Sequence, residues 1–291
     1  MSDDTLFSLP SPFDVAPGQV LLREPPDADP TVLSARLRAG TYEHPFVVDD
    51  GEHLTLYLGS IELIQTVMDK QAPDTLVPGY AHAMMSFLLF NAAPRSILMV
   101  GLGGGALVKA CRALVPGARI EAVDADTAVL GWRAVFHIPP DDARLAIHAG
   151  DGAGFVAARH DVADILMVDA FDDTGFAPAL DCHDFVADAH AALTRRGLMV
   201  TNLAGPSAAF GEFLMAVRDV FDDQLLVIPV RDDGNHVLLA FKDPSMRPVW
   251  HRQHRLAADL EARTGLTMRR CLEDAERVGW RRLPEALWLG D

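Results

Sequence analysis

An apolar run that leads directly into a cluster of glycines constrains the fold of this chain more than any other feature. Residues 97–110 read ILMVGLGGGALVKA, with four glycines in five positions between a strand-like run and a helix-like stretch. Glycine in such number weakens regular structure, so each one needs a compensating purpose. A glycine-rich turn between a strand and a helix is typical of doubly wound α/β folds, where the backbone approaches a bound nucleotide closely.

The pattern that follows residue 95 alternates between two kinds of segment. Helix-like stretches separate five apolar runs, which span residues 96–100, 119–123, 145–149, 164–168 and 198–203. This alternation predicts a parallel sheet covered by helices on both faces. Two further apolar runs are joined by RDDGN, which is short enough to allow only an antiparallel hairpin. We therefore predict an α/β fold, a class I methyltransferase-like (Rossmann-like) sheet with a C-terminal antiparallel hairpin.

The remaining segments divide the chain further. Residues 1–40 are rich in Pro and Asp and are expected to form an irregular N-terminal arm. Residues 41–80 are expected to form a small β-rich N-terminal domain, because Asp50-Gly51 joins two β-prone runs. Residues 81–248 then form the methyltransferase-like domain, and residues 249–291 form a C-terminal helical tail.

Charge and cysteine usage limit the classes of partner. The 291-residue chain has a formal net charge of −16, which disfavours contact with DNA or RNA. Its apolar segments are too interrupted to span a bilayer, and its acidic start lacks a secretory signal. Three cysteines without CxxC spacing fit a reducing compartment. We expect a cytoplasmic protein that acts on a small molecule, without a metal, nucleic acid or membrane.

Acidic residues follow three of the predicted strands. Asp124 comes about 20 residues after the glycines, where an acid typically meets ribose hydroxyls. Asp151, which precedes Gly152, suits either the adenine side of an adenosyl ligand or the N-cap of the next helix. Asp169 ends the fourth run, where it suits a cationic substrate or a base that takes a proton from an amine.

The glycine loop by itself fits two cofactor families. GLGGGA satisfies the GxGxxG/A pattern of NAD enzymes, and GLGGG also satisfies the GxGxG pattern of enzymes that bind an adenosyl-sulfonium. The pair of acids Asp124 and Asp151 favours the sulfonium.

The chain resembles the spermidine synthase (polyamine aminopropyltransferase) family from about Thr41 to Lys242. The resemblance is carried, in order, by TYEHPFVV, LIQTVMD, GYAHAMM, ILMVGLGGG, AVDADTAVL, HAGDGAGFV and ILMVDAFDD. It implies a β-rich N-terminal domain on a methyltransferase-like domain, often assembled as a homodimer. It also implies a transferase that moves an aminopropyl group from decarboxylated S-adenosylmethionine to a small-molecule amine.

The resemblance further implies roles for particular residues. Asp124 is the ribose-binding acid, Asp151 is the adenine-side acid, and Asp169 is the catalytic acid, with Asp172 completing the D-x-x-D pair. Asp169 is also our candidate for the base that takes a proton from the acceptor amine. Gln65 and Tyr80 resemble residues of the donor or amine pocket. The catalytic candidates are thus Asp169, Asp172 and Tyr80, and the cofactor-binding candidates are Gln65, Gly101, Gly103, Gly105, Asp124, Asp151 and Gly152.

The chain departs from the family pattern at several positions, and two of these lose a carboxylate. Leu102 replaces a glycine of the family loop, and the family's Asp-Pro reads Asp172-Asp173. Gly104 stands where the family loop GGGDGG has an acid that helps hold the amino end of the donor. His82 stands where the family's Tyr-His-Glu has a carboxylate. Without the loop acid, ordinary S-adenosylmethionine meets less repulsion. The chain thus resembles a divergent spermidine synthase-like branch. Two alternatives stay open, an S-adenosylmethionine-dependent methyltransferase acting on a small molecule and a non-catalytic adenosyl-ligand-binding protein.

Overall fold

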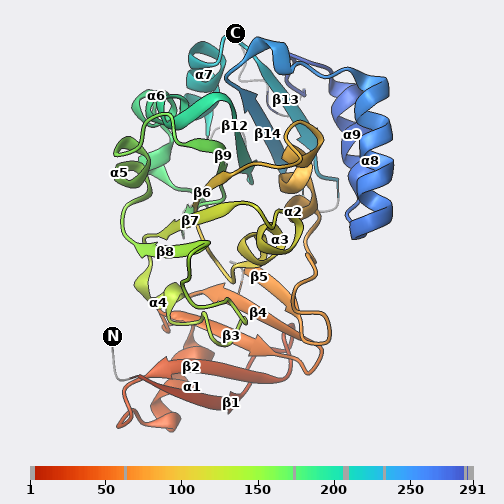
Figure 1. Ribbon diagram of the computed structural model, residues 1–291. Helices are drawn as coiled ribbons and strands as arrows, with labels where there is room; N and C mark the ends of the chain where they lie inside the picture. The colour runs from red at the N-terminus through yellow and green to blue at the C-terminus, as the bar shows by residue number, and fades with distance from the viewer. Residues whose placement is uncertain are drawn as a thin grey trace.

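The computed structural model contains two main sheets, one above the other in Figure 1. It describes residues 4–61, 64–172, 175–205, 210–231, 234–284 and 287, and the side chains of residues 172, 175 and 176 lie outside this description. A short antiparallel ladder also pairs β10 (Phe171–Asp172) with β11 (Gly175–Phe176).

The N-terminal sheet has five antiparallel strands in the order of the sequence. These strands are β1 (Thr5–Pro10), β2 (Gln19–Glu24), β3 (Pro45–Asp49), β4 (His53–Leu58) and β5 (Ile64–Asp69). The predicted hairpin at Asp50-Gly51 is confirmed, because β3 and β4 pair on either side of it and Gly51 has a φ of +97°.

The expectation that residues 1–40 form an irregular arm is wrong. They contain β1, β2 and the helix α1 (Pro30–Ala39). Val20 and Leu22 alternate along β2 and are fully buried, packing in one cluster with Leu33 and Leu37 of α1. The Asp-Pro pair that looked irregular starts this helix, because Asp29 accepts a hydrogen bond from Thr31 as the N-cap.

The second sheet has seven strands in the order β13-β14-β12-β9-β6-β7-β8. They are β6 (Ser96–Val100), β7 (Arg119–Asp124), β8 (Leu145–Ala149), β9 (Ala163–Val168), β12 (Leu193–Leu203), β13 (Leu225–Pro229) and β14 (His236–Phe241). The first five to appear in the sequence are parallel, and β14 pairs antiparallel with both β12 and β13. The predicted Rossmann-like sheet with its C-terminal hairpin is therefore confirmed.

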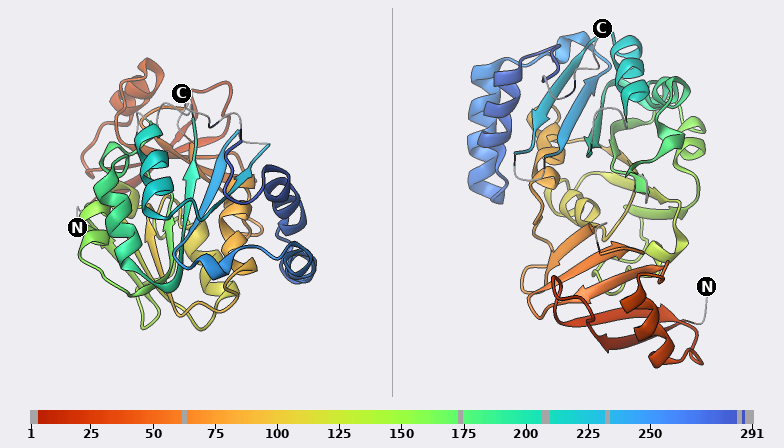
Figure 2. Two further views of the ribbon diagram at one scale, coloured as in Figure 1. Left: turned by 90° about the horizontal axis from the view of Figure 1, so that it is seen from above. Right: turned by 180° about the vertical axis from the view of Figure 1, so that it is seen from behind.

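Helices cover both faces of this sheet, as Figure 2 shows from two directions. The alternation within β6 explains why, since Ile97 and Met99 join one buried cluster while Leu98 and Val100 join the other. The helices on the first face are α2 (Gly79–Met84), α3 (Ala106–Leu114), α8 (Trp250–Thr264) and α9 (Met268–Val278), with the 3₁₀ turn η1 (Met85–Leu89). The helices on the second face are α5 (Gly152–Ala157), α6 (His183–Ala192) and α7 (Gly211–Val220).

Short helical turns complete the fold. They are α4 (Thr127–Leu130), η2 (Pro178–Leu180) and η4 (Pro244–Met246). No helix in the described part of the chain is long and apolar enough to cross a membrane. The domain boundaries placed after residues 80 and 248 stay predictions.

Candidate active site

Two adjoining cavities lie where the parallel strands of the large sheet end. The smaller, about 450 Å³, is lined by the end of β7 and the start of α5, and is called here the β7-side cavity. The larger, about 920 Å³, is lined by α2, the ends of β9 and β12 and the start of α9, and is called the α2-side cavity. Six residues line both cavities, namely Gln65, Gly101, Leu102, Gly103, Asp169 and Phe171.

The glycine loop forms the wall between the two cavities. A Cβ atom at Gly101 would lie 2.0 Å from the backbone oxygen of Asp169, and Gly101 has a φ of +92°. Gly103 has a φ of +50° and also lines both cavities. Gly105 lies outside the lining of both cavities, and it precedes α3 with Ile138 packed against it. At Gly101 and Gly103 the loop therefore brings backbone, rather than side chains, to the site.

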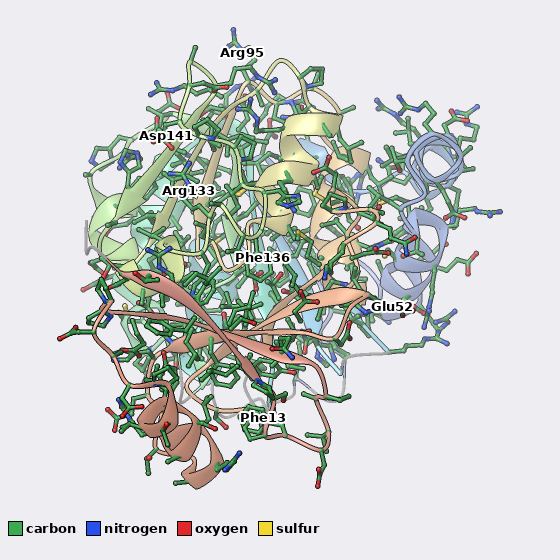
Figure 3. All side chains as sticks on the ribbon, turned by 90° about the horizontal axis from the view of Figure 1, so that it is seen from below. Phe13, Glu52, Arg95, Arg133, Phe136 and Asp141 are labelled. Carbon is green, nitrogen blue, oxygen red and sulfur yellow. The ribbon has the colours of Figure 1, made fainter. Side chains whose placement is uncertain are left out.

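Gly104 is constrained by its neighbours. A Cβ atom there would lie 2.2 Å from Cγ2 of Thr66 and 3.0 Å from the ring of Phe136. Figure 3 labels Phe136 near the centre of the view, next to the N-terminal strands. Because a methyl group and an aromatic ring fill this space, the packing around this backbone leaves no room for an acidic side chain at position 104.

Asp124 holds the loop and faces the β7-side cavity. Its Oδ2 accepts a hydrogen bond from the backbone N–H of Leu102 at 2.8 Å, and its Oδ1 accepts one from Asp126 at 2.9 Å. Burial raises the pKa of the Asp124 carboxyl, and these backbone donors oppose the rise. The backbone of Gly103 also donates to this carboxyl, which leaves about one of its four lone-pair sites for a ligand hydroxyl.

Asp151 caps α5 and lines the same cavity. Its side chain is exposed and accepts hydrogen bonds from the backbone N–H groups of Ala153 at 3.3 Å and Gly154 at 2.7 Å. The N-cap alternative is thus realised in the structure, while a contact with adenine stays a prediction. Gly152, the first residue of α5, also lines this cavity, and Val100 packs closely against it.

Asp169 lies at the junction of the two cavities, one residue beyond β9. The amide of Asn202 donates a 2.9 Å hydrogen bond to Oδ1 of Asp169, and Tyr80 hydrogen-bonds to the same carboxyl group. Burial raises the pKa of Asp169 to about 6, although both hydrogen bonds work in the opposite direction. The carboxyl group is therefore held in place and titrates close to neutrality.

A second amide supports this arrangement. Asn235 donates a 3.1 Å hydrogen bond to Oδ1 of Asn202, which is only 3 % exposed. In the sequence, the only sign that Asn202 belongs to the site is its position near the end of a predicted strand. Asn235 precedes β14, which returns antiparallel to β12, and local sequence carries no sign of this contact.

His82 connects two segments that line the α2-side cavity. Its Nδ1 accepts a hydrogen bond from the backbone N–H of Thr267 at 3.2 Å. Its Nε2 therefore carries the proton and donates to the oxygen of Leu76 at 2.8 Å. Both ring nitrogens are used within the protein, so His82 stands as a structural bridge rather than as a substitute carboxylate.

The structure describes some of the other candidate residues in the site and leaves others outside the described part of the chain. Gln65 lies in β5 and lines both cavities, so the N-terminal sheet contributes to the site. The backbone of Asp172 lies in β10, but its side chain is outside the described part of the chain, and residue 173 lies outside it entirely. Thr267 and Arg270 of the C-terminal tail line the α2-side cavity, and sequence reasoning missed both. In the described residues, no group of three His, Cys, Asp or Glu side chains could hold a metal ion.

Residues 75–209 match the model of the spermine/spermidine synthase domain. A polyamine aminopropyltransferase from Chromobacterium violaceum is 34% identical over 221 residues, which cover 76% of this chain and 84% of that protein.

Solved structures agree on the fold. A probable spermidine synthase from Corynebacterium glutamicum superposes with a TM-score of 0.61 at 18% identity, covering 74% of this chain and 84% of that one. Human methyltransferase-like protein 13, in complex with SAH, superposes with a TM-score of 0.54 at 24% identity, covering 66% and 89%. The fold is thus shared with a methyltransferase, whereas the sequence match over most of both chains decides the family. The chain belongs to the polyamine aminopropyltransferase (spermidine synthase) family.

Proposed function

We propose that this protein transfers an aminopropyl group from decarboxylated S-adenosylmethionine to a small-molecule amine. The β7-side cavity takes the adenosyl part of the donor, and the α2-side cavity takes the acceptor amine. The observation that carries the proposal is the position of Asp169, which lies where the two cavities meet and is hydrogen-bonded to Asn202 and Tyr80.

The donor site uses backbone and carboxylates together. Asp124 accepts a ribose hydroxyl with the lone pair left by its backbone contacts to Leu102, Gly103 and Asp126. Gly101, Gly103 and Gly152 allow close approach of the nucleoside, and Asp151 faces its adenine side. Gln65, which reaches both cavities, contacts the aminopropyl chain. Gly105 supports the loop from outside.

The reaction is a direct displacement. The acceptor nitrogen attacks the carbon next to the sulfonium, the carbon–sulfur bond breaks, and its electron pair goes to sulfur, which leaves as methylthioadenosine. The proton lost by the amine passes to Asp169, with Tyr80 holding the carboxyl group and Asp172 beside the same strand end. A base with a pKa of about 6 is mostly ionised at neutral pH and can accept that proton. Orientation supplies most of the remaining rate enhancement, because the donor carbon is already activated.

Two matched variants test these roles. Asp169→Asn keeps the shape and should lower kcat by at least about 100-fold while methylthioadenosine binding is retained. Asp124→Asn should instead weaken methylthioadenosine binding by about tenfold. Product mass spectrometry gives the first quantity and calorimetry the second. Unchanged turnover of Asp169→Asn would refute the proposed role of Asp169 as the proton acceptor.

One observation favours a second candidate, a methyltransferase that uses S-adenosylmethionine on a small molecule. The packing of Thr66 and Phe136 around Gly104 leaves the loop without an acid that would repel the donor carboxylate. Both donors should be offered with the same amines. A methylated product obtained only with S-adenosylmethionine would replace the aminopropyl proposal, whereas binding without any product would support a non-catalytic adenosyl-ligand-binding protein.

We also propose that the protein acts as a homodimer in the cytoplasm, with neither nucleic acid nor membrane as a partner. The free state of all three cysteines and the net charge of −16 support this setting. Light scattering at micromolar concentration tests the dimer, and a monomer mass would refute it.

A further inference from the structure

Two side-chain amides in series lead to the carboxyl group of Asp169. The Nδ2 of Asn202 donates to Oδ1 of Asp169 at 2.9 Å, and the Nδ2 of Asn235 donates to Oδ1 of Asn202 at 3.1 Å. An ionised carboxylate only accepts hydrogen bonds, so the nitrogen of Asn202 must face Asp169 and its oxygen must face away. Asn202 is only 3 % exposed, and its oxygen therefore depends on the donor that Asn235 supplies.

Asn235 meets Asn202 from a fixed position. It directly precedes β14, which lies between β12 and β13 (Figure 1). Its backbone oxygen accepts a hydrogen bond from the N–H of Val230 at 2.8 Å, which closes the hairpin between β13 and β14. The residue after Val230, Arg231, donates to Asp274 of α9, whose carboxyl group is buried. The turn that carries Asn235 is thus anchored to a packed helix, as a group that orients another side chain requires.

We propose that Asn235 is a positioning residue, which locks the amide of Asn202 with its nitrogen toward Asp169. With the lock in place, Asn202 donates to the ionised carboxyl group and has no oxygen to offer to the protonated one. Without the lock, the amide can turn over about its terminal bond and accept a hydrogen bond from a protonated Asp169. The lock therefore favours the ionised form that a base needs, so this inference rests on the proposed role of Asp169 as the proton acceptor.

Other titratable and charged groups surround Asp169 and stay the same when Asn235 is changed. Tyr80 of α2 hydrogen-bonds to the carboxyl group. The described groups that line one of the two cavities are Glu43, His82, Asp124, Asp126, Asp151 and Arg270. Residues 172, 173, 232 and 233 are also acidic, and their side chains lie outside the described part of the chain. Because all of these groups are common to the wild type and its variants, a comparison between them isolates the amide.

A double-mutant cycle tests the lock. Asn235→Leu keeps a side chain of similar size but removes the donor. The pKa of the Asp169 carboxyl group, followed by ¹³C NMR, should rise by about 0.5–1 pH unit, which corresponds to the loss of one hydrogen bond. In the Asn202→Ala background the same change should leave this pKa unaltered, because Asn235 then has no amide to orient.

Turnover gives a second readout of the same effect. The kcat/KM of Asn235→Leu is divided by that of the wild type at each pH, so that the ionisation of the acceptor amine cancels. This ratio should fall about three- to tenfold between about pH 8.5 and about pH 5, because more of the variant's Asp169 is protonated at the lower pH. A residue with a merely structural role would lower the ratio equally at every pH.

Two further variants complete the test. Asn235→Asp keeps the shape but replaces the donor by an acceptor, so the rise in the pKa of Asp169 should be larger, and the same change in Asn202→Ala measures the effect of the added charge alone. Asn91→Leu is the matched control, because Asn91 accepts a hydrogen bond from the backbone of Ala93 and does not line the α2-side cavity. It should leave the pKa of Asp169 as in the wild type.

Three results would overturn the inference. They are an unshifted pKa in Asn235→Leu, an equal shift when Asn202 is already Ala, and a ratio of kcat/KM values that does not change with pH. Absence of aminopropyl transfer by the wild type would instead overturn the proposed function, while the NMR titration still decides whether Asn235 sets the ionisation of Asp169.

Discussion

The packing around Gly104 predicts that even one added methyl group at this position destabilises the protein. Gly104→Ala adds a single Cβ atom, which would lie 2.2 Å from Cγ2 of Thr66, whereas ordinary contacts begin at 3.4 Å. Relief requires movement of about 1 Å between β5 and the glycine loop, and overpacking of this kind costs about 1–3 kcal/mol. Because Gly104 does not have a positive φ, backbone strain does not add to the cost.

Two further variants isolate the steric contribution. Gly117→Ala is the matched control, because Gly117 also lacks a positive φ and nothing lies within 4 Å of the position that the added methyl group would take. That change should be neutral or stabilising by up to about 1 kcal/mol, through the entropy of the unfolded chain. Thr66→Ser removes Cγ2, so Gly104→Ala should cost markedly less in the Thr66→Ser background than in the wild type.

Denaturant unfolding followed by circular dichroism measures the stability of these variants and of the wild type. The expected order places Gly104→Ala about 1–3 kcal/mol below Gly117→Ala, with recovery in the double variant. If Gly104→Ala is as stable as Gly117→Ala, the steric reason for a glycine at this position is refuted. The loop could then carry an acid, and the glycine at position 104 would need another explanation.

Three further predictions concern the protonation of Asp169 and the structural role of Lys109. The kcat/KM should be retained above pH 6 and fall as the pH drops through about 6, because burial raises the pKa of Asp169 and the base must be ionised; a pH-independent rate between 5 and 8 would contradict this. Asn202→Ala removes a hydrogen bond that lowers the pKa of Asp169, so the acidic limb of the rate profile should move to higher pH. Lys109→Met leaves the carbonyl oxygens of Pro73 and Phe136 without their buried donor, and urea unfolding should show a loss of about 2 kcal/mol; an unchanged midpoint would rule out a structural role for this lysine.

Much of the fold follows from patterns that are local in the sequence. The continuous apolar run at residues 96–100 predicts β6. The run is apolar throughout because every residue from 97 to 100 is buried between two layers of helices. The Asp-Gly-Asn linker predicts the pairing of Pro229 with His236 because so short a connection cannot make a crossover. Asp124 and Asp169 could be placed on the same grounds, since parallel strands end at one edge of their sheet.

Other parts of the site depend on contacts that no local pattern encodes. Asn235 reaches Asn202 only because β14 returns antiparallel to β12. Arg270 reaches the cavity because α9 packs against α2, more than 180 residues earlier in the chain, through the contact between Thr267 and His82. The N-terminal strands escape prediction for a different reason. A high content of Pro and Asp masks the alternation of Val20 and Leu22, although Asp29-Pro30 is an ordinary helix start.

The glycine loop and the acid at the junction of the cavities are mechanically coupled. The backbone N–H of Asp169 donates to the oxygen of Val100 at 2.9 Å, which continues the parallel ladder between β9 and β6 one residue past the strand. The residue that follows β6, Gly101, must therefore pass the carbonyl oxygen of Asp169, where a Cβ atom would lie only 2.0 Å away. A glycine at 101 thus keeps Asp169 in place, because any side chain there would displace the backbone of Asp169. The same ladder that ends the strands fixes Asp169, the proposed base, against the loop that we propose binds the donor.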